Sequence, residues 1–396
     1  MSKKTLLSLA ASLYQLDTIR TAKRLGYRVI TTDNVPLNPG HALADRAYQV
    51  DTTDHEAVLR IAEIERIHGV IAACTDVAVP TAAYIAEKLG LPGPSYRSAL
   101  ALCDKAVFRK LLAEYKFPSP RAVILNADTS IPEDLFEAGC WILKPDRSSG
   151  SKGIYIIQGP EQLAARLPET LAFSPTGTAV LEEFIDGHQG TCEGIVRNNR
   201  IVRAFFLDRQ TAPRPYVATH GHHVPTLLSQ RFQIRVSTLL ERLFEVVNVR
   251  DGPFDCDFVA TTAEVFLLEV TPRVGGNSIS SLLRKATGFD LIEYAVRQAC
   301  GETSTLPDSL DLRPSAVVLL GVMEAGRLRY DMREVNRLRL EPWVESLDFE
   351  VGWGEPVWPF INGRHRIGEA FVWAHDRAAL DARVTELKER LQLRAA

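Results

Sequence analysis

The stretch 254–278 places the strongest constraint on how this chain can fold. Two runs within it, 254–259 and 265–270, alternate apolar and polar residues around a short polar turn, and this pattern predicts a β-hairpin. Pairing about that turn puts Asp257 opposite Glu269. Because opposed residues share one face, with Cβ atoms roughly 4.5–5.5 Å apart, the two carboxylates repel each other unless a positive charge lies between them.

A hard cation such as Mg²⁺ suits two facing carboxylates, because it combines one or two protein carboxylates with substrate phosphates and water. Arg273 follows Glu269 by four residues, and the next segment, Gly275-Gly276-Asn277-Ser278, can present backbone N–H groups to an anion such as a substrate carboxylate. The alternative is a surface hairpin whose acids are simply solvated. The hairpin alone leaves both interpretations open.

The composition is that of an ordinary globular protein. The chain has 396 residues, 46% of them hydrophobic and 24% charged, which is enough for two or three packed domains. A net charge of −3 argues against nucleic-acid binding, which needs a basic surface. No apolar run approaches the ~18 residues of a membrane span. The six cysteines are scattered without a Cys-x-x-Cys pair, so we expect reduced thiols and a cytoplasmic location.

Residues 1–103 alternate strand and helix signals and predict an α/β domain with a parallel sheet. The expected strands are 5–9, 28–32, 47–50 and 69–73. Asp33 ends the second strand, as the ribose-binding acid of a dinucleotide-binding fold would. However, the first turn, 10–15, lacks the glycines that such a fold needs, and we therefore expect no NAD site.

Residues 104–303 form the second expected domain, and residues 311–396 a third lobe that is mostly β and ends in a helix, 377–393. In the middle domain we expect apolar strands, a helix over 230–247, and an irregular segment over 208–226. That segment contains His220-Gly221-His222-His223. Its histidines suggest zinc, but no cysteine is near and no third ligand is evident, so a polar substrate loop or a plain surface loop is favoured.

Several short signals precede the hairpin. Lys144 ends an apolar strand, and a loop rich in small residues follows it through Gly153, an arrangement that can surround a phosphate. It does not match the Gly-x-x-x-x-Gly-Lys-Ser/Thr pattern, which excludes a P-loop. Lys105 lies in an interrupted helix, and Glu182-Glu183 interrupt a later strand. Taken alone, either lysine is more often an ordinary solvated group, and Glu182-Glu183 could mark a hinge or a charged edge strand.

Their order and spacing are more informative, because together with the hairpin they resemble the ATP-grasp superfamily, and its carboxylate–amine ligases in particular. The resemblance covers essentially the whole chain: the first domain is similar to a pre-ATP-grasp domain, the second to the two-lobed ATP-grasp domain with its site between the lobes, and the third to the C-terminal lobe of amino-acid and purine-pathway ligases.

The resemblance implies roles for individual residues. Lys105 and Lys144 match the lysines that grip ATP phosphates, and Arg273 matches the arginine that stabilises the transferring charge. The loop that closes over the phosphates corresponds to Ser148, Ser149, Gly150, Ser151 and Gly153, and the adenine-reading strand to Glu182, Glu183, Phe184 and Ile185. Asp257 and Glu269 match the metal carboxylates.

Three positions depart from the usual pattern. Gln189 stands where relatives often have a glutamate on the ribose. Thr271 stands where many have an asparagine on a second metal ion, so the resemblance leaves one or two ions open. Asp257 is one methylene shorter than the commoner glutamate.

The expected activity is ATP-dependent amide formation through an acyl phosphate, with Lys144 and Arg273 as the catalytic residues. The expected cofactors are ATP and Mg²⁺, with Mn²⁺ as a substitute, and the expected partners are a small carboxylate, a small amine and a second copy of the chain. Gly275, Gly276, Asn277 and Ser278, with His222 and His223 from the irregular segment, are the candidate substrate residues. The alternatives are a ligase that uses bicarbonate or formate, and a nucleotide-binding protein without catalysis.

Overall fold

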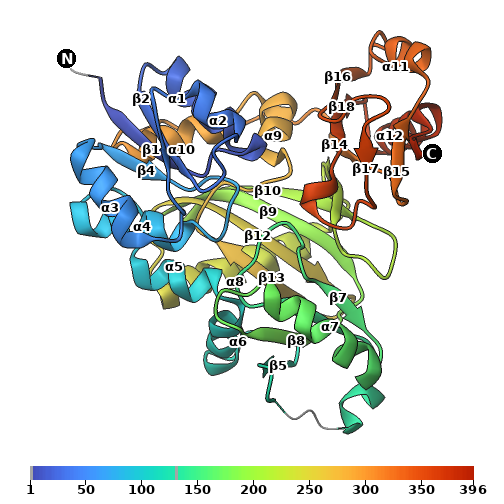
Figure 1. The fold of residues 1–396 in the computed structure, drawn as a ribbon, viewed down its shortest axis with the longest axis horizontal. Coiled ribbons are helices and arrows are strands. Elements are labelled where there is room, and N and C mark those ends of the chain that lie inside the picture. Colours follow the sequence, from blue (N-terminus) through green and yellow to red (C-terminus); the bar gives the residue numbers. More distant parts are fainter. Residues whose placement is uncertain (1–2, 130–132) are drawn as a thin grey trace.

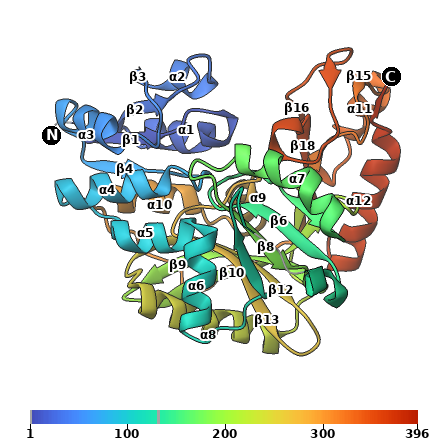
Figure 2. The ribbon, with the colours of Figure 1, turned by 60° about the horizontal axis from the view of Figure 1, so that its bottom comes forward.

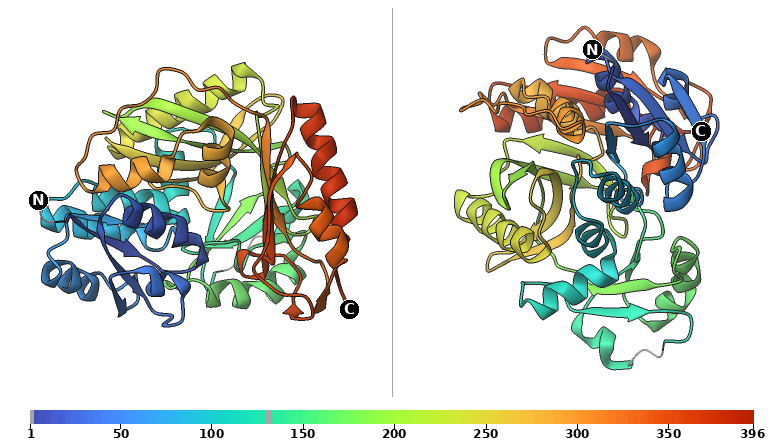
Figure 3. Two further views of the ribbon diagram at one scale, coloured as in Figure 1. Left: turned by 90° about the horizontal axis from the view of Figure 1, so that it is seen from above. Right: turned by 90° about the vertical axis from the view of Figure 1, so that its left-hand side faces the viewer.

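The computed structural model describes residues 3–129 and 133–396. Three parts surround a common centre (Figure 1): an N-terminal α/β domain, a central domain, and a C-terminal lobe on the opposite side of the molecule from the N-terminal domain. The view from above shows the N-terminal and C-terminal parts flanking the central sheet (Figure 3). The mixed α/β architecture expected from the sequence is confirmed.

The N-terminal domain is built on a four-stranded parallel sheet of order β3-β2-β1-β4. All five residues of its first strand are buried, because helices cover both faces of a parallel sheet. Asp54 caps α3 and left-handed Gly90 ends α4, as the sequence indicates. The elements are β1 (Thr5–Leu9), η1 (Leu13–Gln15), α1 (Leu16–Arg24), β2 (Arg28–Asp33), α2 (Pro39–Leu43), β3 (Arg46–Gln49), α3 (His55–Ile64), β4 (Gly69–Ile71) and α4 (Val79–Leu89).

Two short helices, α5 (Tyr96–Cys103) and α6 (Lys105–Glu114), lead into the central domain and meet at Asp104. The Asp104 carboxylate accepts a hydrogen bond from the Val107 amide at 3.0 Å, so it caps α6 and fixes Lys105 as the first residue of that helix.

A four-stranded antiparallel sheet of order β5-β8-β6-β7 forms the smaller lobe of the central domain, beside α6 in Figure 2. Its middle strands have buried core residues on both sides, which matches their near-continuous apolar sequence. The elements of this lobe are β5 (Ala122–Leu125), η2 (Glu133–Ala138), β6 (Trp141–Pro145), β7 (Tyr155–Ile157), α7 (Pro160–Ala172) and β8 (Ala179–Glu183).

The larger lobe belongs to an eight-stranded sheet of order β13-β12-β9-β10-β11-β14-β18-β16. Helix α8 packs on its β13–β10 end through buried Leu239, Leu243 and Phe244. The elements before residue 311 are β9 (His188–Arg197), β10 (Arg200–Thr211), β11 (Thr219–Val224), α8 (Gln230–Val247), β12 (Gly252–Ala260), β13 (Val265–Thr271), α9 (Ile279–Thr287) and α10 (Leu291–Ala299).

The segment expected to be irregular, 208–226, is largely β-structure. Strand β10 continues to Thr211, and β11 pairs with it and with β14. The polar sequence of β11 conceals this strand, because two of its histidines are buried: His222 is 1% exposed and His223 5%. The expectation of an irregular loop was therefore wrong for most of this segment.

Pairing between β11 and β14 carries the large sheet into the C-terminal lobe. The lobe comprises β14 (Ser315–Leu320), β15 (Gly326–Arg329), α11 (Met332–Leu338), β16 (Val344–Phe349), β17 (Pro356–Val357), η3 (Gly363–His365), β18 (Gly368–Trp373), α12 (Arg377–Leu391) and β19 (Arg394–Ala395). No helix in the described ranges is long and apolar enough to cross a bilayer. The boundaries expected at 103 and 311 stay predictions.

Candidate active site

A cavity of about 640 Å³ lies where the three parts of the molecule meet. Its lining comes from the first turn and β4–α4 loop of the N-terminal domain, from both lobes of the central domain, and from η3 of the C-terminal lobe. A cavity of this size, lined by charged groups from separate domains, is typical of a small-molecule site.

The large sheet supplies an acidic wall. Asp257 pairs with Glu269 and Asp255 with Thr271 in the β12–β13 ladder, so the register expected from the alternating sequence is confirmed. The register shifts immediately after Asp257, as a β-bulge does beside many active sites. Both Asp257 and Glu269 line the cavity. Since they occupy opposed positions on neighbouring strands, the backbone ladder fixes their relative positions.

Each of these two carboxylates has a cation as its partner. Lys105 Nζ lies 2.9 Å from Glu269 Oε1, and Arg209 Nη1 lies 3.3 Å from Asp257 Oδ2. Burial opposes the charged amine of Lys105, but the Glu269 and Asp76 carboxylates raise its pKa overall. The Thr191 hydroxyl also donates to Asp257 Oδ1 at 2.7 Å, which orients that carboxylate.

The donors present fit a hard cation bound together with a substrate. Within 3–129 and 133–396, no group of three or more His, Cys, Asp or Glu side chains could hold a metal ion by itself. Two facing carboxylates with room for phosphate and water are the arrangement in which Mg²⁺ is usually bound. Thr271 does not line the cavity; its Oγ1 is buried and has no hydrogen-bond partner among the described residues.

The smaller lobe supplies a basic wall, in which Lys144 is held by Glu182. Lys144 Nζ lies 2.8 Å from Glu182 Oε2, and Arg109 forms a bidentate pair with the same carboxylate. Although burial favours the neutral acid, Arg109 and Lys144 lower the pKa of Glu182 to about 2. Burial lowers the pKa of Lys144 against the opposing effect of Glu182. Glu182, 1% exposed, is thus a charged anchor for both cations.

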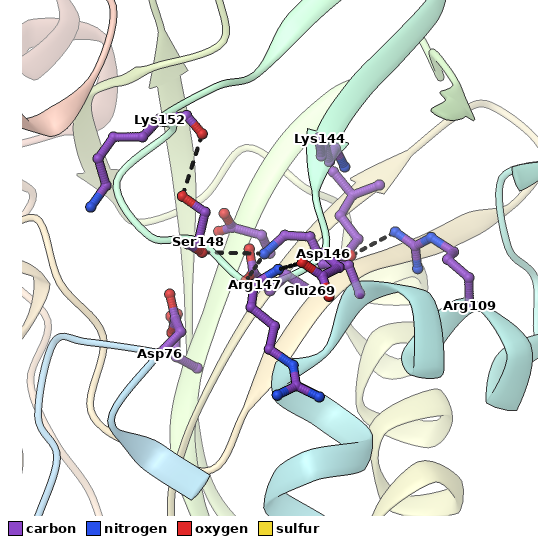
Figure 4. A network of polar contacts seen from close by, with 12 residues as sticks. Asp76, Arg109, Lys144, Asp146, Arg147, Ser148, Lys152 and Glu269 are labelled. Atoms are coloured by element: carbon purple, nitrogen blue, oxygen red, sulfur yellow. Dashed lines mark hydrogen bonds and ion pairs between the residues drawn. The ribbon is translucent and has the colours of Figure 1, made fainter. Parts of the chain in front are cut away.

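The loop 146–153, called the covering loop below, connects β6 to β7. Asp146 is 1% exposed and accepts hydrogen bonds from Ser174 and Thr176, and Arg147 pairs with Asp104 at 2.8 Å. Figure 4 shows this base of the loop beside Lys144 and Glu269, with Ser148 donating to the Lys152 carbonyl at 3.4 Å. The loop is therefore anchored at its base and lines the cavity through residues 148–152.

Arg273 connects the hairpin to the N-terminal domain. Its guanidinium forms ion pairs with Asp76 from that domain and with Asp255 on β12. Burial raises the pKa of Asp255 despite the opposing effect of Arg273. Glu193, opposite Asp255 on β9, is 0% exposed, and burial raises its pKa well above the usual value.

The cavity lining contains most of the site residues expected from the sequence: Lys105, Lys144, Ser148, Ser149, Gly150, Ser151, Glu182, Glu183, Phe184, Ile185, Gln189, His222, Asp257, Glu269, Arg273, Gly276 and Asn277. Five expected residues lie outside the lining: Gly153, His223, Thr271, Gly275 and Ser278. Their expected roles in binding stay predictions, as do those of the lining residues.

Two of the three histidines of β11, His222 and His223, have different surroundings. Burial lowers the pKa of His222 to about 3, so its ring is neutral; its Nε2 lies 3.3 Å from the Thr191 hydroxyl behind Asp257. His223 lies 2.9 Å from Asp381 on α12, which ties β11 to the C-terminal lobe.

Sequence reasoning missed several residues that hold the site together: Asp76, Arg109, Thr191 and Glu193. Glu193 carries a readable signal, because it is a single acid in the apolar run Cys192–Val196. Arg109 lies on the buried face of α6, four residues after Lys105, which helical spacing could have indicated. The others depend on contacts between distant segments and have no local signal.

Comparison with known proteins agrees with this geometry. An ATP-grasp domain matches residues 138–281, and an ATP-grasp N-terminal domain matches residues 19–93. The chain belongs to the ATP-grasp superfamily. This confirms the expected resemblance and the expectation of a ligase-type enzyme that forms carbon–nitrogen bonds.

Among its relatives, a formate-dependent phosphoribosylglycinamide formyltransferase from Paraburkholderia xenovorans is 27% identical over 330 residues, covering 78% of each chain. A D-alanine–D-alanine ligase from Desulforudis audaxviator is 28% identical over 230 residues, covering 54% of this chain and 74% of the relative. The crystal structure of an L-amino acid ligase from Bacillus licheniformis superposes with a TM-score of 0.83 at 17% identity, over 100% of both chains, which shows a shared fold.

Proposed function

We propose that this ATP-grasp protein joins a carboxylate to an amine at the expense of ATP, releasing ADP and phosphate. The observation that carries this proposal is the cavity with an acidic wall, Asp257 and Glu269, facing a basic wall that contains Lys144. Opposed carboxylate and lysine walls fit a magnesium nucleotide, whose metal and phosphates carry opposite charges.

Mg²⁺, held by Asp257 and Glu269, would supply charge neutralisation between the terminal phosphates; Mn²⁺ is a possible substitute. Lys105 and Arg209, which now neutralise these carboxylates, would become available to phosphate oxygens when a metal ion takes their place. Lys144 is presented by Glu182 and Arg109 in a buried setting, where a positive charge acts more strongly than in water.

Phosphoryl transfer to the acid would give an acyl phosphate, which the amine then attacks at the acyl carbon to form the amide. This sequence requires positioning and charge stabilisation more than covalent help from the protein. The covering loop would exclude water, because an exposed acyl phosphate hydrolyses. Arg273, fixed between Asp76 and Asp255, would stabilise oxyanion charge, and the segment 275–278 would orient the substrate carboxylate.

A second candidate is a ligase whose acid is formate or bicarbonate. The relatedness to the formate-dependent formyltransferase, over 330 residues, favours this candidate. The two functions share the nucleotide and metal positions and differ only in the acid accepted.

Phosphate release with Mg²⁺ and ATP tests both, using amino acids singly and in pairs, with formate and bicarbonate as separate arms. Release that needs an acid and an amine together, with a condensed product identified by mass, supports the amide-ligase proposal. Release driven by formate or bicarbonate selects the second candidate. ATP binding without turnover in every arm would contradict both and favour a nucleotide-binding protein.

A further inference from the structure

A single residue in the C-terminal lobe, Gly363, joins the covering loop to the N-terminal domain through its backbone N–H and carbonyl. The Gly363 N–H donates to the Gly150 carbonyl at 2.9 Å, and the Gly363 carbonyl accepts from the Tyr14 hydroxyl at 2.9 Å. Tyr14 lies in η1 after the first strand, and Gly150 lies near the middle of the covering loop. All three residues line the cavity.

The packing at this junction is tight. A Cβ atom at Gly363 would lie 3.1 Å from the Tyr14 hydroxyl oxygen and 3.6 Å from Gly150 Cα. Gly150 itself has φ of 69°, a left-handed conformation that favours glycine. A side chain at either position would therefore strain or displace the contact between the covering loop and η3.

Arg366 holds the ring of Tyr14 in place. The Arg366 guanidinium lies over its ring at 4.9 Å from the centroid, and Arg366 is 9% exposed. Burial raises the pKa of Tyr14, so its hydroxyl keeps the proton that it donates to Gly363.

The same arginine connects to the proposed substrate segment. Arg366 forms ion pairs with Glu350 and, at 3.3 Å, with Glu369. The Ser278 hydroxyl donates to Glu369. Polar contacts thus run without a gap from Ser278 through Glu369 and Arg366 to Tyr14, and from Tyr14 through Gly363 to the covering loop.

We propose that Tyr14 is a positioning residue that, through Gly363, holds the covering loop against the C-terminal lobe and links its closure to the segment 275–278. The inference rests on the proposed function in one respect, namely that the covering loop shields the transferred phosphate. Tyr14 touches neither reacting atom in this scheme, and its contribution is to the fraction of time that the loop is closed.

The test compares Tyr14→Phe, which removes only the hydroxyl, with Tyr84→Phe. Tyr84 lies in the same domain, and its hydroxyl donates to Glu56 on the exposed side, at 2.6 Å. Hydrogen–deuterium exchange of the amides in 148–153 is measured with Mg²⁺ and a non-hydrolysable ATP analogue. Loss of one hydrogen bond is expected to speed exchange in Tyr14→Phe about fivefold, with no change in Tyr84→Phe.

A second readout uses the substrates identified by the phosphate-release assay. A loop that opens more often exposes the acyl phosphate, so Tyr14→Phe should form more ADP per amide product at an unchanged Tm. Gly363→Ala, which crowds the same junction but leaves the tyrosine side chain itself unaltered, should produce the same two changes.

The outcomes separate the inference from the function on which it rests. One outcome is that the analogue slows amide exchange in the loop of the wild type and slows it by the same factor in Tyr14→Phe and in Gly363→Ala. That result overturns the positioning role of Tyr14, while the proposed function stands. If the analogue leaves the wild-type loop unprotected, the covering role fails and the inference fails with it. If Tyr14→Phe lowers the Tm but changes neither the exchange of the loop amides nor the ADP formed per amide product, Tyr14 is a purely structural residue. This result also contradicts the proposal.

Discussion

The two walls of the cavity hold their charged groups in different ways. On the acidic wall, Asp257 and Glu269 are placed by the backbone register of neighbouring strands. On the basic wall, Lys144 is placed by a side-chain partner, Glu182, which Arg109 in turn supports. Removing the charge of a side chain leaves its position in the backbone ladder unchanged, whereas it breaks an ion pair. Neutralising a carboxylate of the acidic wall, which has one cation as its partner, should therefore cost less stability than neutralising Glu182, which pairs with two buried cations.

The largest expected effect is that of Glu269→Gln on turnover. The substitution keeps the size and register of the side chain but removes a charge from the proposed metal site, so we expect kcat to fall about 10³-fold or more. The midpoint of chemical unfolding should fall less than in Glu182→Gln, because the ladder is intact and the buried Lys105, which loses Glu269, still has the Asp76 carboxylate nearby. The measurement is steady-state ADP formation across a range of Mg²⁺ concentrations.

Glu264→Gln is the matched control, since Glu264 lies on the same hairpin beside the turn and pairs with Arg235 on the exposed side. Its turnover should equal that of the wild type. Near-normal activity in Glu269→Gln would remove this residue from the metal site, and a large loss of stability would show that register alone does not hold the acidic wall.

Glu182→Gln should produce the largest loss of stability. The neutral amide leaves Arg109 and Lys144 buried without their charge partner, and breaking a buried pair in this way costs about 3–5 kcal/mol. The free energy of unfolding, from urea titration, measures the effect. Glu183→Gln is the control: Glu183 pairs with Arg121, whose side chain is 59% exposed, and the change should cost less than about 1 kcal/mol. Equal costs for the two variants would contradict the anchoring role.

The ion pairs of Glu182 with Arg109 and Lys144 also make the free energy of unfolding depend on pH. The folded pKa of Glu182, about 2, lies below its ordinary value of 4.5, so its stabilisation is complete above pH 4.5 and is lost as the pH falls toward 2. The wild type therefore approaches Glu182→Gln in stability over that interval, and the gap between them should narrow as the solution becomes more acidic. A gap that stays constant between pH 7 and pH 3 would show that Glu182 is already neutral in the folded protein.

Lys144→Ala tests whether the basic wall serves the nucleotide. A lost charge-assisted hydrogen bond to phosphate should raise the KM for ATP about tenfold to 100-fold. Lys110→Ala, on the exposed side of α6, is the control and should leave that KM unchanged. An unchanged dependence on ATP concentration in Lys144→Ala would limit this lysine to neutralising Glu182.

The same difference between the walls explains what the sequence could predict. A period-two alternation fixes which residues face each other in a hairpin, so the positions of Asp257 and Glu269 were readable. Glu182 could be placed on a strand, but its pairing with Arg109 joins residues 73 positions apart, and no local pattern encodes such a contact. Strand β11 was missed because a polar residue usually indicates an exposed position, whereas His222 is buried in this strand.

The smallest expected effect separates two adjacent glycines of the proposed substrate segment. A Cβ atom at Gly275 would lie 1.6 Å from Glu193 Oε1, whereas at Gly276 the nearest atom, Cys74 Cβ, would be 3.9 Å away. Gly275→Ala must therefore displace the buried Glu193 or the segment itself, and should cost about 1–3 kcal/mol of stability. Gly276→Ala should stay within about 0.5 kcal/mol of the wild type.

Urea titration of both alanine variants measures this difference, and KM for the acid substrate shows whether the segment has moved. If Gly275→Ala is as stable as Gly276→Ala, the segment is not packed against Glu193, and the acidic wall is less rigid than its register implies. If Gly275→Ala loses stability and Glu193→Ala in the same chain does not reduce the loss, the Asp255 carboxyl, whose Cγ lies 3.2 Å from the same Cβ position, sets the limit. Either result would show whether the segment 275–278 is fixed by packing against the acidic wall or can move relative to it.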